Sequence, residues 1–140
     1  MASNFIEIEK ALIVAVETVD STTPTSFPNN ELVNKPDGLW LKVSNLHSET
    51  TPVTMGDGGE DNHRGILQID INYPANKGSG ASLGKADEFS DYFKAGKALL
   101  YNAQCVKIIS CSLNPANPAR YVGGYYRLTL SINYYARTTR

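Results

Sequence analysis

Thirteen residues near the end of the chain, Tyr125 to Arg137, alternate between apolar and polar side chains. Successive side chains of a strand point to opposite faces of its sheet, so this alternation predicts a strand with one buried face. A pattern of this length needs neighbouring strands and a core to cover it. The predicted core face holds Tyr126, Leu128, Leu130, Ile132 and Tyr134, and the outward face holds Arg127, Thr129, Ser131, Asn133 and Tyr135.

Three further segments have the pattern of strands, namely Leu39–Leu46, Gly65–Tyr73 and Gln104–Leu113. Two others repeat apolar residues at spacings of three and four, which is typical of amphipathic helices. The helices are predicted from about Phe5 to Val19 and from about Leu83 to Asn102. Their apolar stripes are Phe5, Ile8, Leu12, Ala15 and Val19 in the first and Ala86, Phe89, Phe93, Gly96 and Leu100 in the second.

These elements predict an α+β fold with the order α-β-β-α-β-β. We expect a single mixed sheet of four strands, or slightly more, with the two main helices packed on one face. A length of 140 residues fits one domain that spans residues 1–140. The segments between the elements, Asp20–Gly38, His47–Arg64 and Asn76–Gly84, lack periodicity and are predicted to be irregular.

The first helix is apolar on most of its surface. Ala11, Ile13, Val14 and Val16 lie beside its main stripe and leave little polar surface beyond the first turns. A helix of this kind is expected to be buried on more than one side.

Composition excludes several classes of protein. Apolar residues make up 41% and charged residues 19% of the chain, which is ordinary for a globular protein and excludes wholesale disorder. The formal net charge is −1 and no three basic residues are adjacent, which argues against a protein that mainly grips nucleic acid. The longest apolar stretch, Ala11–Val16, is far too short to span a membrane.

Both cysteines, Cys105 and Cys111, fall in the predicted strand Gln104–Leu113. Six residues of strand span about 20 Å, whereas the Cα atoms of a disulfide lie roughly 4.4–6.8 Å apart. The two cysteines therefore cannot bond each other in an unbroken strand. Both point to the same face, and we interpret them as small buried residues in a reducing compartment.

A glycine-rich segment, Gly78–Lys85, opens the second predicted helix, as a phosphate-binding loop would. A Walker A motif fails at two positions, because Ser79 stands where glycine is required and Ala86 where serine or threonine is required. The glycine-rich fingerprint of dinucleotide-binding proteins is also incomplete, because Leu83 stands where glycine or alanine is required. We interpret the segment as a hinge-like loop.

The candidate chemical groups do not complete a catalytic or metal site. Asp57, Glu60, Asp61 and His63 lie in one predicted loop, but their spacing does not match an EF-hand or a zinc motif. His47, the only other histidine, flanks the same loop, and no nucleophile motif accompanies it. The sequence therefore predicts a protein that is not an enzyme, with no catalytic residue, cofactor or metal.

Five tyrosines gather in the last part of the chain: Tyr121, Tyr125, Tyr126, Tyr134 and Tyr135. Ordinary packing within the sheet is the first interpretation of these tyrosines and takes about half the weight, because strands favour aromatic residues. Contact between subunits is the next interpretation, since exposed tyrosines are enriched at protein interfaces. Stacking on single-stranded nucleic acid is a further alternative.

Several short motifs together resemble the gpU-like tail terminator family of tailed bacteriophages and related prophage tail proteins. They are a Trp-bearing strand (Leu39-Trp40-Leu41), a strand of the form G-x-L-Q-I-x-I-x-x-P from Gly65 to Pro74, and a helix that opens with Ala86-Asp87 and continues with Phe89. An N-terminal helix and a closing strand that ends in aromatics complete the resemblance, which spans Phe5 to Tyr135.

The resemblance implies a structural virion protein that forms a ring, typically a hexamer, on the end of the tail tube. Such a ring stops tube polymerisation and provides the surface that joins tail to head. Its partners would be further copies of itself, the tail tube protein and a head completion or connector protein, with at most non-specific proximity to DNA and no membrane. It would be assembled in the bacterial cytoplasm and reside in the virion tail. The expected interface residues are Lys77, Ser79, Arg127 and Tyr135.

Two alternatives remain open from the sequence. One is a head–tail connector or another minor virion protein of similar ring geometry. The other is a small-molecule-binding protein or an enzyme, which a buried polar pocket containing groups of perturbed pKa would favour.

Overall fold

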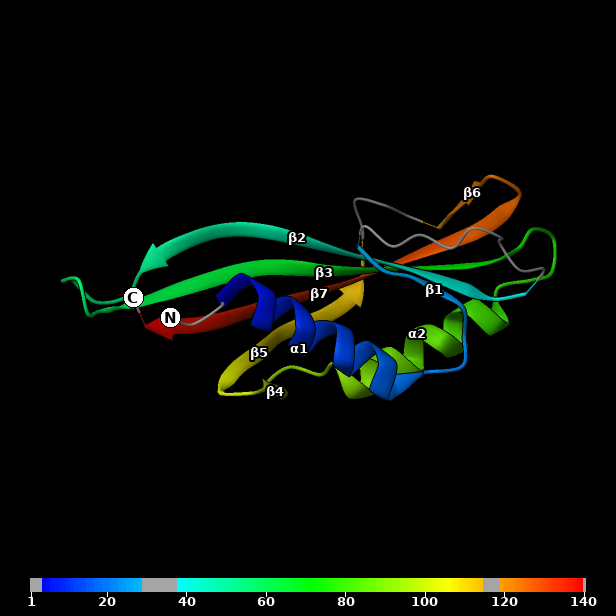
Figure 1. Cartoon of the computed structure of the whole chain (residues 1–140). Coiled ribbons are helices and arrows are strands. Elements are labelled where there is room, and N and C mark those ends of the chain that lie inside the picture. The colour runs from blue at the N-terminus through cyan, green and yellow to red at the C-terminus, as the bar shows by residue number, and fades with distance from the viewer. Residues whose placement is uncertain (1–3, 29–37, 115–118, 140) are drawn as a thin grey trace.

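The computed structural model describes residues 4–28, 38–114 and 119–139. Within these ranges it has two helices and seven strands (Figure 1). In chain order they are α1 (Asn4–Val19), β1 (Thr25–Ser26), β2 (Trp40–Pro52), β3 (Glu60–Pro74), α2 (Gly80–Tyr92), β4 (Ala98–Tyr101), β5 (Gln104–Leu113), β6 (Arg120–Val122) and β7 (Tyr125–Thr139).

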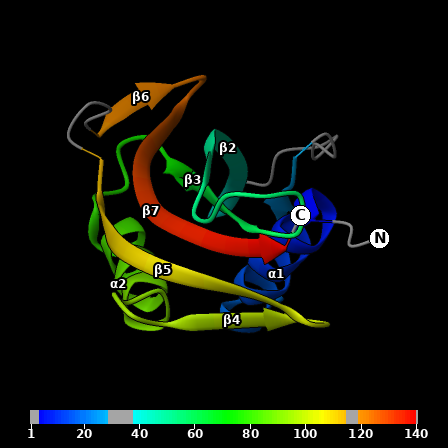
Figure 2. The ribbon, with the colours of Figure 1, turned by 90° about the vertical axis from the view of Figure 1, so that its left-hand side faces the viewer.

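The predicted four-stranded α+β sheet with the order α-β-β-α-β-β is wrong. Strands dominate the described chain, and all seven belong to one sheet with the order β1-β2-β3-β7-β5-β4, to which β6 adds by pairing with β7. The sheet is mixed, because β1 runs parallel to β2 while the other pairs are antiparallel. Figure 2 shows that β7 bends strongly and that the sheet curls around it.

The prediction that His47–Arg64 forms an irregular loop is also wrong. β2 and β3 extend through this segment as a long hairpin, and Thr51 still pairs with Asn62 near its end. Only residues 53–59 lie outside the two strands. The arms have no apolar alternation, because the hairpin projects past the helices (Figure 1) and its buried side chain is the polar His63, whose ring lies 5.3 Å from that of Phe5 at the start of α1.

The second predicted helix is too long. α2 ends at Tyr92, and the chain then turns through Gly96, whose φ of +87° is in the region that glycine tolerates best. The following residues form β4, which places Leu99 in the core and leaves Leu100 73% exposed. The stripe that was predicted to run on through Gly96 and Leu100 is therefore interrupted by a turn and a strand.

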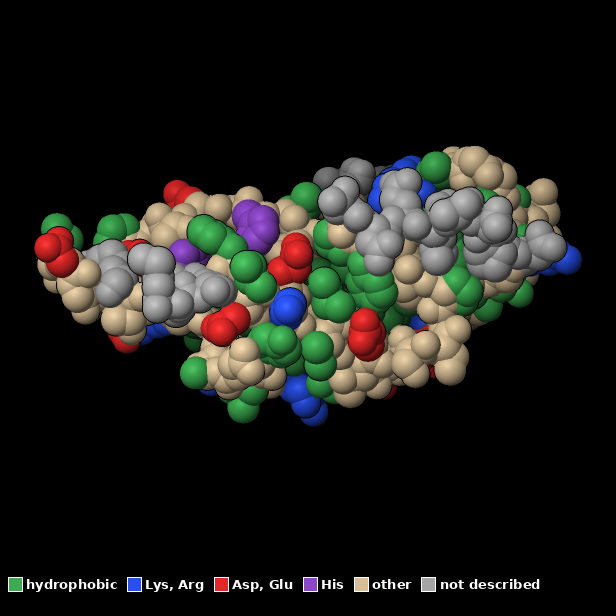
Figure 3. Space-filling model, in the orientation of Figure 1, with side chains coloured by type: hydrophobic (Ala, Val, Ile, Leu, Met, Phe, Trp, Pro, Cys, Tyr) green, Lys and Arg blue, Asp and Glu red, His purple; other side chains and the backbone are tan. Residues whose placement is uncertain are grey.

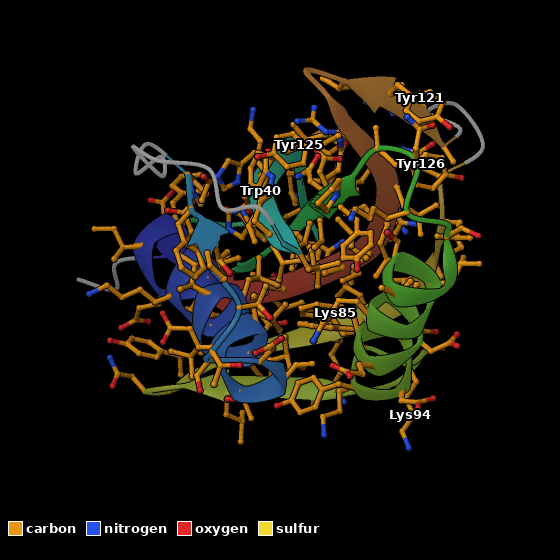
Figure 4. The ribbon with its side chains drawn as sticks, turned by 90° about the vertical axis from the view of Figure 1, so that its right-hand side faces the viewer. Trp40, Lys85, Lys94, Tyr121, Tyr125 and Tyr126 are labelled. Atoms are coloured by element: carbon orange, nitrogen blue, oxygen red, sulfur yellow. The ribbon has the colours of Figure 1, made fainter. Side chains whose placement is uncertain are left out.

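Both helices pack against the same face of the sheet (Figures 1 and 4). Ile8 and Leu12 of α1 and Phe89 of α2 are at most 2% exposed. The core side chains of the sheet that they cover are Leu41, Val43, Leu67, Ile69, Ile71, Leu99, Val106, Ile108, Leu128, Leu130, Ile132, Tyr134 and Ala136.

α1 is covered on one side only within the described chain. Its outer side presents Ile6 at 60% and Val14 at 45% exposure, and Phe5 at its start is 58% exposed although it was predicted to lie in the buried stripe. α1 was predicted to be buried on more than one side, and within the described chain it is buried on one side only. In Figure 3 hydrophobic side chains are visible over the part of the surface where α1 lies.

A bulge in β5 separates the two cysteines. The register of β5 on β7 shifts between Ile108 and Ser110. Cys111 therefore packs against the core, whereas Cys105 lines a hollow on the other face of the sheet. Both are free and half-buried, so the prediction of a shared face is wrong because it assumed a regular strand.

Candidate interface surfaces

The four predicted interface residues lie in two separate places. Lys77 and Ser79 are exposed in the turn between β3 and α2. Arg127 lies at the same end of the sheet, near the start of β7, and Tyr135 lies at the other end, eight residues or about 26 Å of strand further along. The structure therefore does not unite them in one patch.

Ser79 borders a groove formed with the β6–β7 hairpin. The groove has a volume of about 200 Å³ and is lined by Asn76, Gly78, Ser79, Tyr121 and Tyr126. The two tyrosine rings lie 5.5 Å apart with an angle of 60° between their planes, and Tyr121 is 67% exposed (Figure 4). An aromatic pair of this kind suits a contact with another molecule, because it buries area while keeping two hydroxyl groups.

Arg127 is partly buried and bound within the fold. Its Nε donates a hydrogen bond of 2.8 Å to Oδ1 of Asn72, which is fully buried. Beside it the hydroxyl of Thr129 donates to Oδ1 of Asp70 at 2.8 Å, and Arg120 lies 3.5 Å from the same hydroxyl. Arg127 thus belongs to a polar network on the face of the sheet away from the helices.

The outward face of β7 was expected to be open to solvent, but near the start of the strand, around Arg127, it is covered. Thr129 and Ser131 are 1% and 9% exposed. The rings of Trp40 and Tyr125 meet edge to face at 5.5 Å on the same side of the sheet (Figure 4). The polar residues of β7 are therefore covered here by other parts of the chain.

Tyr135 lies in the second place, at the opposite end of β7. It lines a hollow of about 300 Å³ together with Cys105, Lys107 and Arg137. The register sets Tyr135 between Arg64 in β3 and Lys107 in β5, so three cationic residues surround one half-buried aromatic ring. We call this set, Arg64, Cys105, Lys107, Tyr135 and Arg137, the basic groove.

No ion pair in the described part of the chain includes a cation of the basic groove. The ion pairs found there both involve Lys85, which lies elsewhere. Arg64, Lys107 and Arg137 are each exposed. A second hollow of about 310 Å³, bordered by Arg64, Ile66 and Ile109, extends the groove along the same face.

The candidate metal ligands of the segment before Arg64 are separated by the hairpin. Asp57 is exposed in its turn, whereas His63 is buried in β3. The ring nitrogens of His63 lie 2.9 Å from the Thr50 hydroxyl and 2.8 Å from that of Thr138. Across the described ranges no three His, Cys, Asp or Glu side chains gather as a metal site would require.

The glycine-rich loop before α2 does not aim its lysine at a phosphate. Lys85 instead lies between the helices (Figure 4), where Nζ contacts Oδ2 of Asp20 at 2.5 Å and Oε2 of Glu88 at 2.9 Å. Burial opposes ionisation of Asp20, but hydrogen bonds from Lys85, Thr23 and Thr22 outweigh it and hold the pKa of Asp20 well below its usual range. Burial likewise opposes the charge on Lys85, yet its two carboxylate partners raise its pKa.

Two further groups have raised pKa values because they are buried. Burial raises the pKa of the Cys111 thiol, and it raises the pKa of Tyr134 to about 12, with the carboxylate of Glu9 adding to the second shift. The Tyr134 hydroxyl donates a hydrogen bond to Oδ1 of Asn45. The perturbed groups are thus held by partners within the fold.

The sequence missed Arg64, Lys107 and Arg137 as members of a common surface. Each lies on a different part of the chain, and only the pairing of β3 and β5 with β7 brings them together. For Lys107 and Arg137 the available signal was their place on the outward face of a predicted strand, whereas Arg64 fell at the end of a segment that was predicted to be irregular. In the described part of the chain no helix is both long and apolar enough to cross a membrane.

Comparison with known proteins relates the sequence to one family. The sequence model of the family described as phage tail terminator protein matches residues 7–134. No curated protein matches the chain. Eleven chains of solved structures match its fold. One of them is 16% identical and superposes with a TM-score of 0.72 over 97% of this chain and 96% of the other, a likeness that shows the fold alone.

Proposed function

Because this chain belongs to the phage tail terminator family, we propose that copies of it form a ring, of six subunits, on the end of the tail tube. The family makes it a structural component of a phage tail that contacts other tail components. The ring would end polymerisation of the tube and present the surface to which the head is joined. Residues 1–140 would act in it as one domain.

The observation that carries this proposal is the match to the family over residues 7–134, most of the chain. Two features of the structure support assembly. The outer side of α1 leaves Ile6 and Val14 exposed, as a helix that packs against a neighbouring subunit would. The basic groove and the Tyr121–Tyr126 pair are separate surfaces, so each can receive a different neighbour in an assembly.

The proposed partners are further copies of the chain, the tail tube protein and a head completion or connector protein. We assign the groove at Ser79, the neighbouring Lys77 and the surface at Tyr135 to these contacts. Arg127 is assigned a supporting role, because its guanidinium already binds Asn72. DNA would pass near the ring without being recognised, and assembly would take place in the bacterial cytoplasm before the protein enters the virion.

The test combines mass and tail length. Native mass spectrometry and sedimentation of the purified chain over a range of concentrations should give a closed oligomer, and addition of polymerising tube protein should promote it. Tubes assembled with the chain should have a capped end and a limited length in electron micrographs. A chain that stays monomeric with and without tube ends, and leaves tube length unlimited, would refute the proposal.

Tyr135→Ala and Arg127→Glu test the assigned residues within that assay. Tyr135→Ala should keep the circular dichroism spectrum and weaken assembly. Arg127→Glu should lower stability as well, because it leaves Asn72 without its donor. If both variants fold and cap tubes as the wild type does, these residues are not part of the interface.

A further inference from the structure

Charge is segregated along the β2–β3 hairpin. Residues 43–63 contain no lysine or arginine, and their four acidic residues are Glu49, Asp57, Glu60 and Asp61. The turn at residues 53–59 also presents Met55, which is 91% exposed, and Val53, which is 39% exposed. Figure 3 shows acidic and hydrophobic side chains together at this projecting end of the molecule. We call residues 53–59 the hairpin tip.

The basic groove has the opposite character. It combines the cations Arg64, Lys107 and Arg137 with the ring of Tyr135 and a hollow of about 300 Å³. The chain as a whole carries a formal charge of only −1, so the two surfaces are local and complementary features of a nearly neutral molecule. Complementary charged surfaces favour encounter and fix the register of a contact.

Met55 in the hairpin tip cannot reach the hollow beside Tyr135 in its own molecule. Arg64 of the groove lies in β3, four residues after the start of that strand at Glu60. Four residues of strand, about 13 Å, separate Glu60 from Arg64 and from its pairing partner Tyr135, and Met55 lies beyond Glu60. Arg137, which pairs with Asn62, is the cation of the groove nearest to the tip. β3 is paired with β2 on one side and β7 on the other along this length, so the arm cannot fold back.

We propose that the hairpin tip of one copy docks in the basic groove of a second copy of this chain. Met55 enters the hollow beside Tyr135, and Asp57 lies against the cations Lys107 and Arg137. A flexible, unbranched methionine suits an irregular hollow lined by an aromatic ring. The inference rests on the proposed ring and names the two surfaces that form its contact.

This contact joins different patches of two subunits, so each copy keeps a free tip and a free groove. Repetition of the contact leads from copy to copy until the ring closes. Because the charges involved are exposed, the attraction is screened by salt and the free subunits remain soluble.

A single cysteine placed in the hairpin tip tests this docking, because Cys105 already lies in the groove. In Met55→Cys, a mild two-electron oxidant that removes the two thiol hydrogens should form a disulfide between residue 55 of one copy and Cys105 of the next. Bonded Cα atoms must lie within about 7 Å, so the bond reports close approach. Because Met55 is so exposed, the variant should fold as the wild type does.

The expected product is a ladder of dimer, trimer and larger covalent species that ends at a closed ring, with the 55–105 peptide pair identified by mass spectrometry. Met55→Cys combined with Cys105→Ser is the matched control and should lose the ladder. A product that stops at a dimer indicates a reciprocal contact and overturns the proposal. So does an oligomer that forms without any 55–105 bond, in which case the proposed ring still stands.

Charge reversal gives an independent test. Asp57→Lys alone and the pair Lys107→Glu with Arg137→Glu alone should each weaken self-association at least tenfold in 50 mM salt, and less in 500 mM salt. Mixing the two variants should restore association between them, because the reversed tip meets a reversed groove. If the groove variants self-associate normally but no longer bind tube ends, the groove receives the tube protein and the proposal fails.

Discussion

The ring of Tyr134 in β7 covers Gly65, its partner across the ladder in β3. A Cβ atom at position 65 would lie 2.4 Å from the Tyr134 hydroxyl oxygen and 3.0 Å from the backbone oxygen of Leu46. The same hydroxyl donates a hydrogen bond of 2.5 Å to Oδ1 of Asn45 in β2. One side chain therefore ties three adjacent strands together at the base of the projecting hairpin, and position 65 must be glycine for lack of space.

Gly65→Ala should destabilise the protein by about 1–3 kcal/mol, because the added methyl group displaces a buried ring or the backbone beside it. The free energy of unfolding, measured by urea titration with circular dichroism, checks this. Gly84→Ala is the matched control, since a Cβ at that helical position meets nothing within 4 Å. The control should be neutral or stabilising by up to about 1 kcal/mol. Equal stabilities of Gly65→Ala and the wild type would show that the Tyr134 ring does not occupy this position.

Tyr134 should also make the fold sensitive to alkali. Its pKa in the folded state is raised to about 12, above the value of about 10 for an unfolded tyrosine. The corresponding stability is fully present below pH 10 and is lost as the pH rises towards 12. The wild type should therefore lose more stability than Tyr134→Phe between pH 9.5 and 11.5 in thermal melts. Parallel losses in the two proteins would contradict the assignment.

Lys85 and Asp20 connect α2 to the end of α1, with side-chain exposures of 15% and 7%. Lys85→Met leaves the Asp20 carboxylate buried without its cation and should cost about 2–4 kcal/mol. Glu88→Gln is the control, because Glu88 bonds the same lysine but is 55% exposed, and it should change stability by less than about 0.5 kcal/mol. Denaturant unfolding of the three proteins measures both effects, and equal costs would show that burial of the pair has no energetic role.

The same pair predicts acid sensitivity. The pKa of Asp20 is depressed in the folded state, so its contribution to stability is present above pH 4 and is lost as the pH falls through the folded-state value. Asp20→Asn should be less stable than the wild type at pH 7, and the gap should narrow between pH 4 and pH 2. Melting temperatures over this range provide the measurement. A constant gap would mean that the carboxylate gains nothing from its ionised form.

The elements that the sequence predicted well are those whose side chains face the core. α1 and β5 were placed within one residue of their observed bounds, and β7 extends two residues beyond its predicted end. In each, burial imposes a regular apolar period that can be read without knowing the fold. The hairpin arms beyond His47 and before Arg64 have no such period, since the side chain buried there is the polar His63, which packs against Phe5 and the hydroxyls of Thr50 and Thr138. The apolar pattern therefore did not indicate strand there.

The candidate site was less predictable for a different reason. Tyr135 was identified from its place on the polar face of β7, but its neighbours Lys107 and Arg64 are set by pairing partners that a single sequence does not reveal. The bulge between Ile108 and Ser110, which brings Cys105 into the groove and Cys111 into the core, leaves no mark in the apolar pattern. Arg127 was taken as exposed because the polar network around Asn72 was equally invisible.

The end of α2 provides a last prediction, which separates the observed fold from the longer helix expected from the sequence. Phe93 is fully buried against Phe89 and Tyr92, with ring centroids 6.3 and 5.3 Å away. Leu100 was expected in the same apolar stripe but is 73% exposed in β4. Phe93→Ala should therefore cost about 3–5 kcal/mol, because it leaves a cavity in the core.

Leu100→Ala is the matched truncation and should change the free energy of unfolding by less than about 0.5 kcal/mol, since it removes little buried surface. Both values come from denaturant titrations monitored by circular dichroism. If Leu100→Ala costs as much as Phe93→Ala, Leu100 is buried, and the chain continues as a helix beyond Tyr92 instead of turning at Gly96. A small cost for Phe93→Ala would instead show that the ring lies outside the core that holds α2 on the sheet.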